Sequence, residues 1–578
     1  MTIQAAPIKL QSCPKAVTRD LDKALAPETT VRNALARLRS TGADLFAGVR
    51  QVDAGRLGIP VYMAICGPAA RQVMPVRKQM GKGSSAAQAK ASAIMEFVER
   101  YSFFSFRERQ TGFFQASFET ARRKFGDRLL PVATMLASVN DDLPAAVAAQ
   151  LLNLTQWQFY GATDLATGAL VWLPLDWFFM LGEFNGSSAG NSNEESLLQG
   201  VCELVERHVC ALIDRKRPQL ATIAPESIGD PVLSGLVAAF RRNGVNLVLK
   251  DFSLGMPLPT VGALAWDERT FPSSSEIVFT AGTATTAAKA AIRAVTEVAQ
   301  LGGDFCTNSC YEASGLPKFG QLAQIDWLLH GPAIGLQSLP DAGNDDIFAE
   351  LQTAVAGLGN VYAIETTHPA LGIPAHYCIA PGLQFRERDK NQSLGLFIGR
   401  KLVESESAPV ARAGLAAIAN AYPGAHFLPF FDGMLALREE KFAQAASLFA
   451  KAMPKQPDPE ALALAAFYAG HANTLAGEWQ AAAPFLREAL ANNPALAEAA
   501  NLLGVCYFRQ GDYAAAEAAF DRTLAIDKGM ATALANRGVS RKFLGKRDAA
   551  RQDLEAALAL DASLDFAASH LAELARTE

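Results

Sequence analysis

The chain has 578 residues, which is too long for one hydrophobic core, so about two to four domains are expected. Half of its residues are hydrophobic, 19% are charged and the net charge is -5, a balance that excludes a strongly basic nucleic-acid-binding surface. No stretch reaches the roughly 18 continuous apolar residues of a membrane span, and the start MTIQAAPIKLQ lacks the pattern of a signal peptide. Eight cysteines in so long a chain do not form a disulfide framework, and we interpret the closest pair, Cys306 and Cys310, as incidental. These features predict a soluble protein of the reducing cytoplasm.

The first 410 residues mix strand and helix patterns. Apolar runs bounded by Gly and Pro predict strands in LGIPVYMAICGP, GALVWLPLDWFFM, VNLVLKDFS and GIPAHYCIAPG. Helical periodicity predicts long helices over 84–105, 193–215 and 285–301. We therefore expect an α+β domain over residues 1–410, with a boundary in 403–425.

The last 150 residues repeat with a period of 34. Three sets of landmarks share this spacing: Gly470, Gly504 and Gly538; Gly477, Gly511 and Gly545; and Leu486, Phe520 and Leu554. A 34-residue period is typical of tetratricopeptide repeats, in which each repeat is a pair of helices. Phe449 lies 37 residues before Leu486 and indicates a weaker fourth copy. We expect an all-α solenoid over residues 426–578 that binds a peptide or protein.

Three of the predicted helices carry carboxylates at helical spacing. Positions i, i+4 and i+7 or i+8 share one face of a helix. The pattern predicts three stripes: Ser92, Glu96 and Glu99; Glu195, Gln199, Glu203 and Glu206; and Arg293, Glu297 and Gln300.

The neighbours of these stripes are mostly apolar, so the helices should be buried and their carboxylates must be paired or bind cations. Oxygen ligands without His or Cys favour Mg²⁺, and arginines beside them favour phosphate. The pattern indicates Mg²⁺ ions that hold a nucleotide triphosphate, without a P-loop. For one E-x-x-E-R alone, a surface stripe paired with Lys or Arg is the simpler interpretation. Two copies, each after a segment rich in Gly and small residues (81–92 and 185–192), favour a site.

Three segments together resemble the signature segments of YcaO-domain proteins. They are GKGSSAAQAKASAIMEFVERYSFF, SSAGNSNEESLLQGVCELVERHV and AAIRAVTEVAQ, and GIPAHYCIAPG resembles the closing strand of that family. The resemblance spans roughly residues 12–400 and implies a fold that binds ATP and Mg²⁺ through these helices.

The resemblance also implies roles for individual residues. The implied Mg²⁺ ligands are Glu96, Glu99, Glu203, Glu206 and Glu297. The implied nucleotide contacts are Ser188, Asn191, Glu195 and Gln199, with Arg207 and Arg293 on the phosphates and, from the short segment KALAPETT, Lys23 and Thr30. No catalytic side chain is assigned.

The implied reaction is ATP-dependent activation of a peptide backbone amide, which gives an azoline with a side-chain nucleophile or a thioamide with sulfide. Azoline-forming members typically end in a proline-rich tail, whereas this chain ends AELARTE, with no proline after Pro494. Members with helical repeats are commonly named accessory factors for a ribosomal protein methylthiotransferase. A non-catalytic ATP-binding accessory protein therefore remains the alternative. A carboxylate-bridged redox metal site is disfavoured because no E-x-x-H motif accompanies the glutamates. The substrate peptide, a sulfur-donor or accessory protein bound by the repeats, and a homodimer all stay open.

Overall fold

The computed structural model describes residues 6–52, 55–109, 111–301, 319–385, 392–527 and 529–576. The chain forms two compact units. One comprises Met1–Ala145 and Gln156–Gln392, and the other comprises Ala146–Thr155 and Ser393–Glu578. Helix α6 therefore belongs to the second unit although it lies within the first in sequence. Helix α13 also belongs to the second unit, whereas the boundary expected at 403–425 would place it in the first domain.

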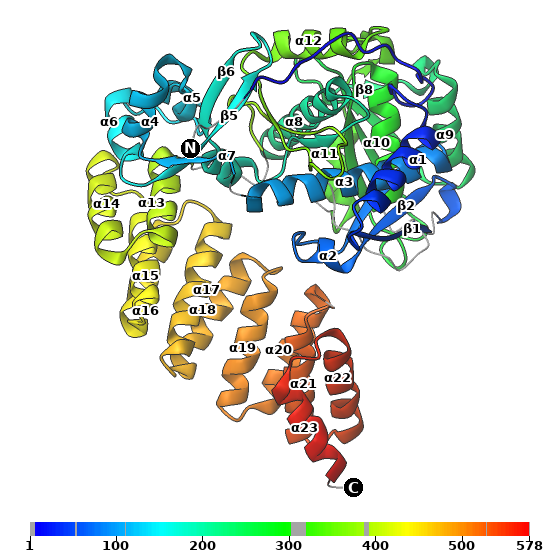
Figure 1. Ribbon diagram of the computed structural model, residues 1–578. Coiled ribbons are helices and arrows are strands. Elements are labelled where there is room, and N and C mark those ends of the chain that lie inside the picture. The colour runs from blue at the N-terminus through cyan, green and yellow to red at the C-terminus, as the bar shows by residue number, and fades with distance from the viewer. Residues whose placement is uncertain are drawn as a thin grey trace. The chain divides into compact units, whose positions relative to one another are not determined.

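The first unit contains most of the shorter helices and all the described strands (Figure 1). Its helices are α1 (Pro27–Ser40), α2 (Pro68–Arg71), α3 (Ala86–Arg109), α4 (Phe118–Phe125), α5 (Val132–Ala137), α7 (Leu175–Gly182), α8 (Asn193–Lys216), α9 (Pro231–Arg242), α10 (Ala287–Leu301), α11 (Asp326–Leu329) and α12 (Ile347–Leu358). Its strands are β1 (Phe46–Val52), β2 (Val61–Cys66), β3 (Lys78–Lys82), β4 (Phe114–Ala116), β5 (Trp157–Asp164), β6 (Leu170–Pro174), β7 (Ser187–Ala189), β8 (Thr222–Ile223), β9 (Asn246–Asp251), β10 (Thr260–Trp266), β11 (Val278–Thr283), β12 (Ala333–Ile334), β13 (Tyr362–Glu365) and β14 (Ala375–Ile379). The α+β class expected from the sequence is confirmed.

These strands form three sheets, with strand orders β1-β2-β3, β11-β10-β9-β8-β12 and β4-β5-β13-β14-β7, in which β6 pairs with β5. The three long helices predicted from periodicity are present as α3, α8 and α10. One predicted strand is only partly correct. GALVWLPLDWFFM forms β6 and then helix α7, which begins directly after Pro174. Pro174 is compatible with a helix start, and the apolar run alone could not distinguish a buried strand from a buried helix.

Two segments of the first unit have the same order of elements. Helix α1 precedes the antiparallel meander β1-β2-β3 and helix α3, and α9 precedes the meander β9-β10-β11 and helix α10. In each segment the first helix packs on the last, α1 on α3 and α9 on α10. We call these segments the first and second meander units.

A glycine on the last strand of each meander unit allows the final helix to approach closely. A Cβ at Gly81 of β3 would lie 2.0 Å from the backbone nitrogen of Ala93, and one at Gly282 of β11 would lie 2.4 Å from that of Ala294. Glu96 and Glu297 each follow their glycine by 15 residues. The two carboxylates therefore occupy equivalent places on α3 and α10.

Helix α8 lies in the core of the first unit, where it packs against β14 and α12. Its residues Leu197, Val201 and Val205 are fully buried. The helix begins after Ser192, whose hydroxyl accepts a hydrogen bond from the backbone N–H of Glu195. This capping bond fixes the first turn, which carries Glu195.

The second unit is all helical, and its helices succeed one another from α13 to α23 in Figure 1. They are α6 (Ala145–Leu152), α13 (Leu394–Ser405), α14 (Ala408–Ala421), α15 (Leu428–Arg438), α16 (Phe442–Ala452), α17 (Pro459–Leu475), α18 (Trp479–Asn492), α19 (Ala497–Arg509), α20 (Tyr513–Ile526), α21 (Ala531–Phe543), α22 (Arg547–Leu560) and α23 (Asp565–Arg576).

The glycine period has a direct structural cause. Gly477, Gly511 and Gly545 lie at turns between paired helices with φ of 80°, 81° and 75°, where glycine is favoured. A Cβ at Gly504 would lie 2.5 Å from the ring of Phe520, so the small residue lets α19 pack on α20. A Cβ at Gly433 would lie 2.8 Å from Phe449, which identifies α15 and α16 as the weaker fourth copy. The predicted repeats are confirmed.

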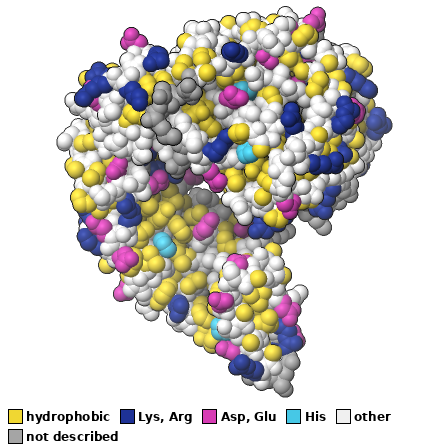
Figure 2. Space-filling model, in the orientation of Figure 1, with side chains coloured by type: hydrophobic (Ala, Val, Ile, Leu, Met, Phe, Trp, Pro, Cys, Tyr) yellow, Lys and Arg dark blue, Asp and Glu magenta, His cyan; other side chains and the backbone are white. Residues whose placement is uncertain are grey.

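Exposed hydrophobic side chains occur on the repeats, including Leu464, Leu475 and Phe543. Figure 2 shows hydrophobic side chains gathered over the visible face of this unit. No described helix is both long enough and apolar enough to cross a membrane.

Candidate functional site

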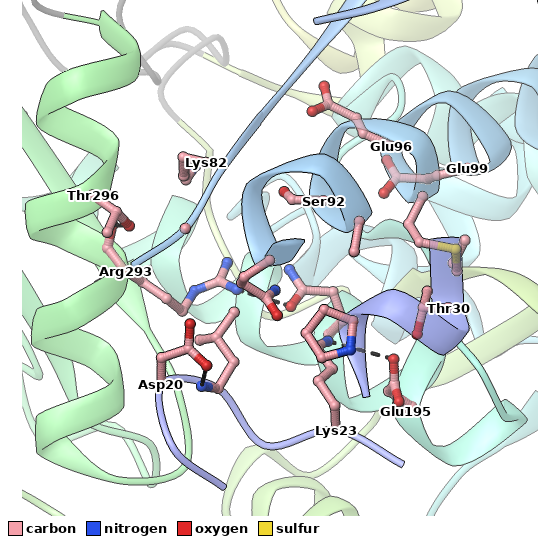
Figure 3. A pocket seen from close by; sticks show the side chains of 18 of the residues that line it. Asp20, Lys23, Thr30, Lys82, Ser92, Glu96, Glu99, Glu195, Arg293 and Thr296 are labelled. Atoms are coloured by element: carbon pink, nitrogen blue, oxygen red, sulfur yellow. Dashed lines mark hydrogen bonds and ion pairs between the residues drawn. The ribbon is translucent and has the colours of Figure 1, made fainter. Parts of the chain in front are cut away.

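A cavity of about 320 Å³ lies within the first unit, where α3, α8 and α10 converge with β3, α1 and the segment before α1. Figure 3 shows Ser92, Glu96 and Glu99 on α3, Arg293 and Thr296 on α10, and Asp20 and Lys23 on the segment that precedes α1. The cavity is lined by Asp20, Leu21, Lys23, Leu25, Pro27, Thr30, Lys82, Gly83, Ser84, Gln88, Ala91, Ser92, Met95, Glu96, Glu99, Arg100, Ala189, Asn191, Glu195, Gln199, Glu203, Glu206, Arg207, Ile292, Arg293, Thr296, Glu297 and Gln300. Charged side chains of both signs dominate this lining.

Helix α3 contributes two glutamates, Glu96 and Glu99, and Arg100 is paired with Glu99. Arg100 Nη1 lies 3.3 Å from Glu99 Oε1 and donates to Ser187 Oγ at 3.1 Å, and Ser187 Oγ donates to Glu99 at 2.9 Å. Burial raises the pKa of Glu99 to about 8 and also raises the pKa of Glu96, against the opposing effect of the Arg100 guanidinium. A cation bound beside these carboxyls would oppose the effect of burial, because it favours their ionised forms.

Helix α8 contributes Glu203, Glu206 and Arg207. Arg207 Nη2 lies 3.7 Å from Glu203 Oε1, one turn earlier on the same helix. Glu206 Oε2 accepts a hydrogen bond of 3.0 Å from the backbone N–H of Thr283, at the end of β11. This bond fixes Glu206 against the second meander unit and leaves its other oxygen for a ligand.

Glu195 joins the start of α8 to the N-terminal segment. It accepts hydrogen bonds from Ala24 N at 2.9 Å and from Asn191 Nδ2 at 3.0 and 3.1 Å, and Lys23 Nζ lies 3.5 Å away. Thr30 Oγ1 donates to Asn191 Oδ1 at 3.0 Å. The short N-terminal motif and the SAGNSNEES segment, far apart in sequence, therefore form one wall of the cavity.

Helix α10 contributes Arg293 and Glu297. Arg293 Nη1 donates to Gln199 Oε1 at 3.0 Å, and its Nε has no hydrogen-bond partner among the described residues. Glu297 forms an ion pair with Lys82, the last residue of β3. Burial lowers the pKa of Lys82 to about 8, and the neighbouring Arg293 guanidinium acts in the same direction.

The structure brings nearly all the residues expected from the sequence into this one cavity. Ser188 is the exception, because it does not line the cavity. It is fully buried, and its hydroxyl lies 3.3 Å from that of Ser196. Residues 188 and 189 are successive in strand β7, so their side chains point to opposite faces, and Ala189 is the one that lines the cavity. The spacing in SAGNS gave no sign of this strand.

Sequence reasoning assigned no role to three charged residues of the cavity, Asp20, Lys82 and Arg100. Asp20 accepts a hydrogen bond of 2.7 Å from Ser84 Oγ, and Lys82 pairs with Glu297. Lys82 lies between Gly81 and Gly83, and a charged residue between two glycines was a signal that could have been used. Asp20 has no comparable signal. Cys306 and Cys310 lie outside the described residues.

The donor set fits a hard divalent cation. Seven carboxylates and five cationic side chains line the cavity, and no His or Cys is among the lining residues. The described carboxylates do not form a ready-made metal cluster, since no group of three or more His, Cys, Asp or Glu side chains is arranged to hold an ion. Four of them, Glu99, Glu195, Glu203 and Glu297, are paired with Lys or Arg instead. Mg²⁺ keeps several of its waters and is commonly shared between one or two carboxylates and substrate phosphates, so it does not need a complete protein cage. Glu96, Glu99, Glu203, Glu206 and Glu297 remain the residues that would hold it.

Several known proteins are similar to this chain in sequence or in fold. A protein of Methanothermobacter thermautotrophicus, described as uncharacterized, is 25% identical over 408 residues, which cover 66% of this chain and 99% of that protein. A heterocyclase in complex with substrate and cofactor has a similar fold, with a TM-score of 0.54 at 23% identity over 66% of this chain. The match spans 55% of the heterocyclase. The structure of YcaO from Methanopyrus kandleri bound with AMPPCP and Mg²⁺ matches with a TM-score of 0.48 at 21% identity, over 64% of this chain and 94% of that one.

A tetratricopeptide repeat model matches residues 474–536. A family model described as YcaO cyclodehydratase, ATP- and Mg²⁺-binding, matches residues 80–384, which is more than half of the chain and includes all three glutamate-bearing helices. The chain belongs to the YcaO family and carries tetratricopeptide repeats after its YcaO domain.

Proposed function

We propose that this protein uses ATP and Mg²⁺ to activate a backbone amide of a peptide or protein, leading to a thioamide or an azoline. The observation that carries the proposal is the single cavity into which three helices direct six glutamates together with Arg207 and Arg293. Cyclodehydration in the family description and the donor chemistry of this cavity both support it.

In this reaction a nucleophile adds to the amide carbonyl and the resulting oxygen anion takes the terminal phosphoryl group of ATP. Loss of phosphate, with the carbonyl oxygen, then completes the replacement. Mg²⁺ held by Glu96, Glu99, Glu203, Glu206 and Glu297 would neutralise charge on the triphosphate. The protein contributes positioning. Arg207 and Arg293 would grip phosphate oxygens, while Lys23, Thr30, Asn191, Glu195 and Gln199 form the polar wall that would surround the nucleotide.

Calorimetry tests the nucleotide site. ATP with Mg²⁺ should bind, whereas ATP with EDTA should bind at least about tenfold more weakly, because without the cation nothing links the cavity carboxylates to the triphosphate. Equal affinity in the two conditions would contradict the proposed site. Turnover of ATP that rises with added peptide supports an enzyme. Binding without turnover would support an accessory factor, which is the alternative.

The repeats are proposed to recruit the substrate or an accessory or sulfur-donor protein. Exposed Leu464, Leu475 and Phe543 on the repeat unit support this role. Substituting these three residues with Ser should lower turnover on a protein-borne substrate and leave the affinity for Mg·ATP unchanged. Unchanged turnover would show that the repeats recruit through another surface.

A further inference from the structure

Lys82 is a cavity residue whose position is fixed by its neighbours in sequence. A Cβ at Gly81 would lie 2.0 Å from Ala93 N, and a Cβ at Gly83 would lie 2.7 Å from the side chain of Gln88. The end of β3 is therefore pressed against the start of α3, which places the Lys82 side chain at the cavity with 22% of it exposed.

The partner of Lys82 belongs to the other meander unit. Its ammonium pairs with Glu297 of α10, so the ion pair joins β3 of the first meander unit to α10 of the second meander unit. In the second meander unit the residue equivalent to Lys82 is Thr283, which directly follows Gly282. The backbone N–H of Thr283 donates to Glu206 of α8. Each strand end thus supplies one donor to a cavity glutamate, but of the two donors only the Lys82 ammonium carries a positive charge.

This ion pair uses a carboxylate that the site needs for a metal. Glu297 cannot direct the same oxygen to the Lys82 ammonium and to a divalent cation. A divalent cation that binds Glu297 repels the Lys82 ammonium and so favours its displacement, and the ammonium then remains in the cavity beside Arg293.

We propose that Lys82 couples metal binding to nucleotide binding: it occupies Glu297 until a divalent cation displaces it, and it then pairs with the triphosphate. This inference rests on the proposed function. It makes Lys82 a residue that contacts substrate and also limits binding of the metal alone.

The inference predicts opposite effects on two ligands. Lys82→Gln removes the competitor for Glu297, so Mn²⁺ without nucleotide should bind about fivefold more tightly than to the wild type. The same variant loses a phosphate contact, so Mg·ATP should bind about tenfold more weakly. If the role of Lys82 were merely structural, the substitution would weaken the binding of both Mn²⁺ and Mg·ATP. Lys82→Arg should restore Mg·ATP binding, and Lys78→Gln, on the exposed start of the same strand, should match the wild type for both ligands.

The experiment measures Mn²⁺ binding by electron paramagnetic resonance and Mg·ATP binding by calorimetry, with thermal melts of every variant. If Lys82→Gln binds both ligands as the wild type does, or loses both, the inference is wrong. If the wild type itself does not bind Mg·ATP, the proposed function fails instead.

Glu297→Gln provides an independent test should Lys82→Gln fold poorly. This variant frees Lys82 and removes one carboxylate, so ATP in EDTA should bind about fivefold more tightly than to the wild type. Unchanged or weaker binding of metal-free ATP would overturn the inference.

Discussion

Gly81 and Gly282 occupy equivalent positions in the two meander units, and a Cβ on either one would overlap the backbone of the following helix. The overlapped nitrogens belong to Ala93 and Ala294, each twelve residues after its glycine. The same close approach thus positions Glu96 of α3 and Glu297 of α10, two glutamates that line the cavity and belong to different meander units.

Gly282→Ala should therefore destabilise the first unit. The added Cβ would lie 2.4 Å from Ala294 N and 2.5 Å from Ala290 O, both of them backbone atoms that cannot rotate away. We expect a loss of about 2–3 kcal/mol in unfolding free energy, typical of overpacking, measured by urea denaturation. The altered position of α10 should also weaken Mg·ATP binding.

Gly235→Ala in α9 is the matched control, because a Cβ there would meet no atom within 4 Å. Alanine is the better residue inside a helix, so this change should raise stability by about 0.5–1 kcal/mol. If both alanine variants destabilise the protein equally, close packing at Gly282 is not the cause.

The two faces of α8 should respond differently to substitution. Glu206→Gln keeps an oxygen that can accept the hydrogen bond from Thr283 but loses the charge that a metal requires. We expect an unchanged melting temperature and a loss of Mg·ATP affinity of about tenfold or more. Leu204 is 1% exposed, so Leu204→Asp should cost more than about 3 kcal/mol by burying an unpaired charge. Equal behaviour of the two variants in melts and calorimetry would show that α8 is not divided into a site face and a core face.

The sequence was sufficient to predict the helices that bear the site, because their periodicity is a local property. The stripes on α3, α8 and α10 needed no knowledge of tertiary structure, and most of their residues lie in one cavity. Ser188 was misplaced because the direction of a strand side chain depends on where a three-residue strand begins. Lys82 was missed because its partner, Glu297, is more than 200 residues away and belongs to the other meander unit. Such pairings are products of topology, which periodicity does not encode.

His376 should make the stability of the first unit depend on pH. It lies in β14, is fully buried and has Nδ1 3.0 Å from Ser196 Oγ, while Nε2 has no partner among the described residues. Burial lowers the pKa of His376 to about 3. The unfolded chain therefore binds a proton at a higher pH than the folded chain does, and stability is lost as the pH falls from about 6.5 toward 3.

The measurement is urea denaturation at pH 7 and pH 5. Between these two pH values His376 alone should lower the free energy of unfolding by about 2 kcal/mol. In His376→Gln this difference between the two pH values should shrink by that amount, whatever the absolute stability of the variant. His330→Gln is the control, because His330 is exposed. A pH dependence that His376→Gln leaves unchanged would assign the effect to other groups.

Helix α6 makes the position of a truncation critical. Its residues Ala148, Leu151 and Leu152 are almost completely buried, and it belongs to the compact unit that begins again at Ser393. Thr155 Oγ1, just after α6, donates to Glu406 Oε1 at 2.8 Å, at the end of α13. A chain that ends at residue 392 lacks α13 and all the other helices of the unit to which α6 belongs. A chain that ends at residue 421 keeps α6, α13 and α14 together.

The chain ending at 421 should bind Mg·ATP within about threefold of the full chain, because every residue that lines the cavity lies before residue 301. The chain ending at 392 should melt at a lower temperature and aggregate, because the buried face of α6 becomes exposed. Thermal melts and calorimetry on both chains check this. Adding Leu151→Ser and Leu152→Ser to the shorter chain should restore its solubility, since these changes remove the apolar surface that the truncation exposes. If the chain ending at 392 is as stable and as soluble as the one ending at 421, α6 does not depend on the second unit, and the boundary of the YcaO domain lies at 392.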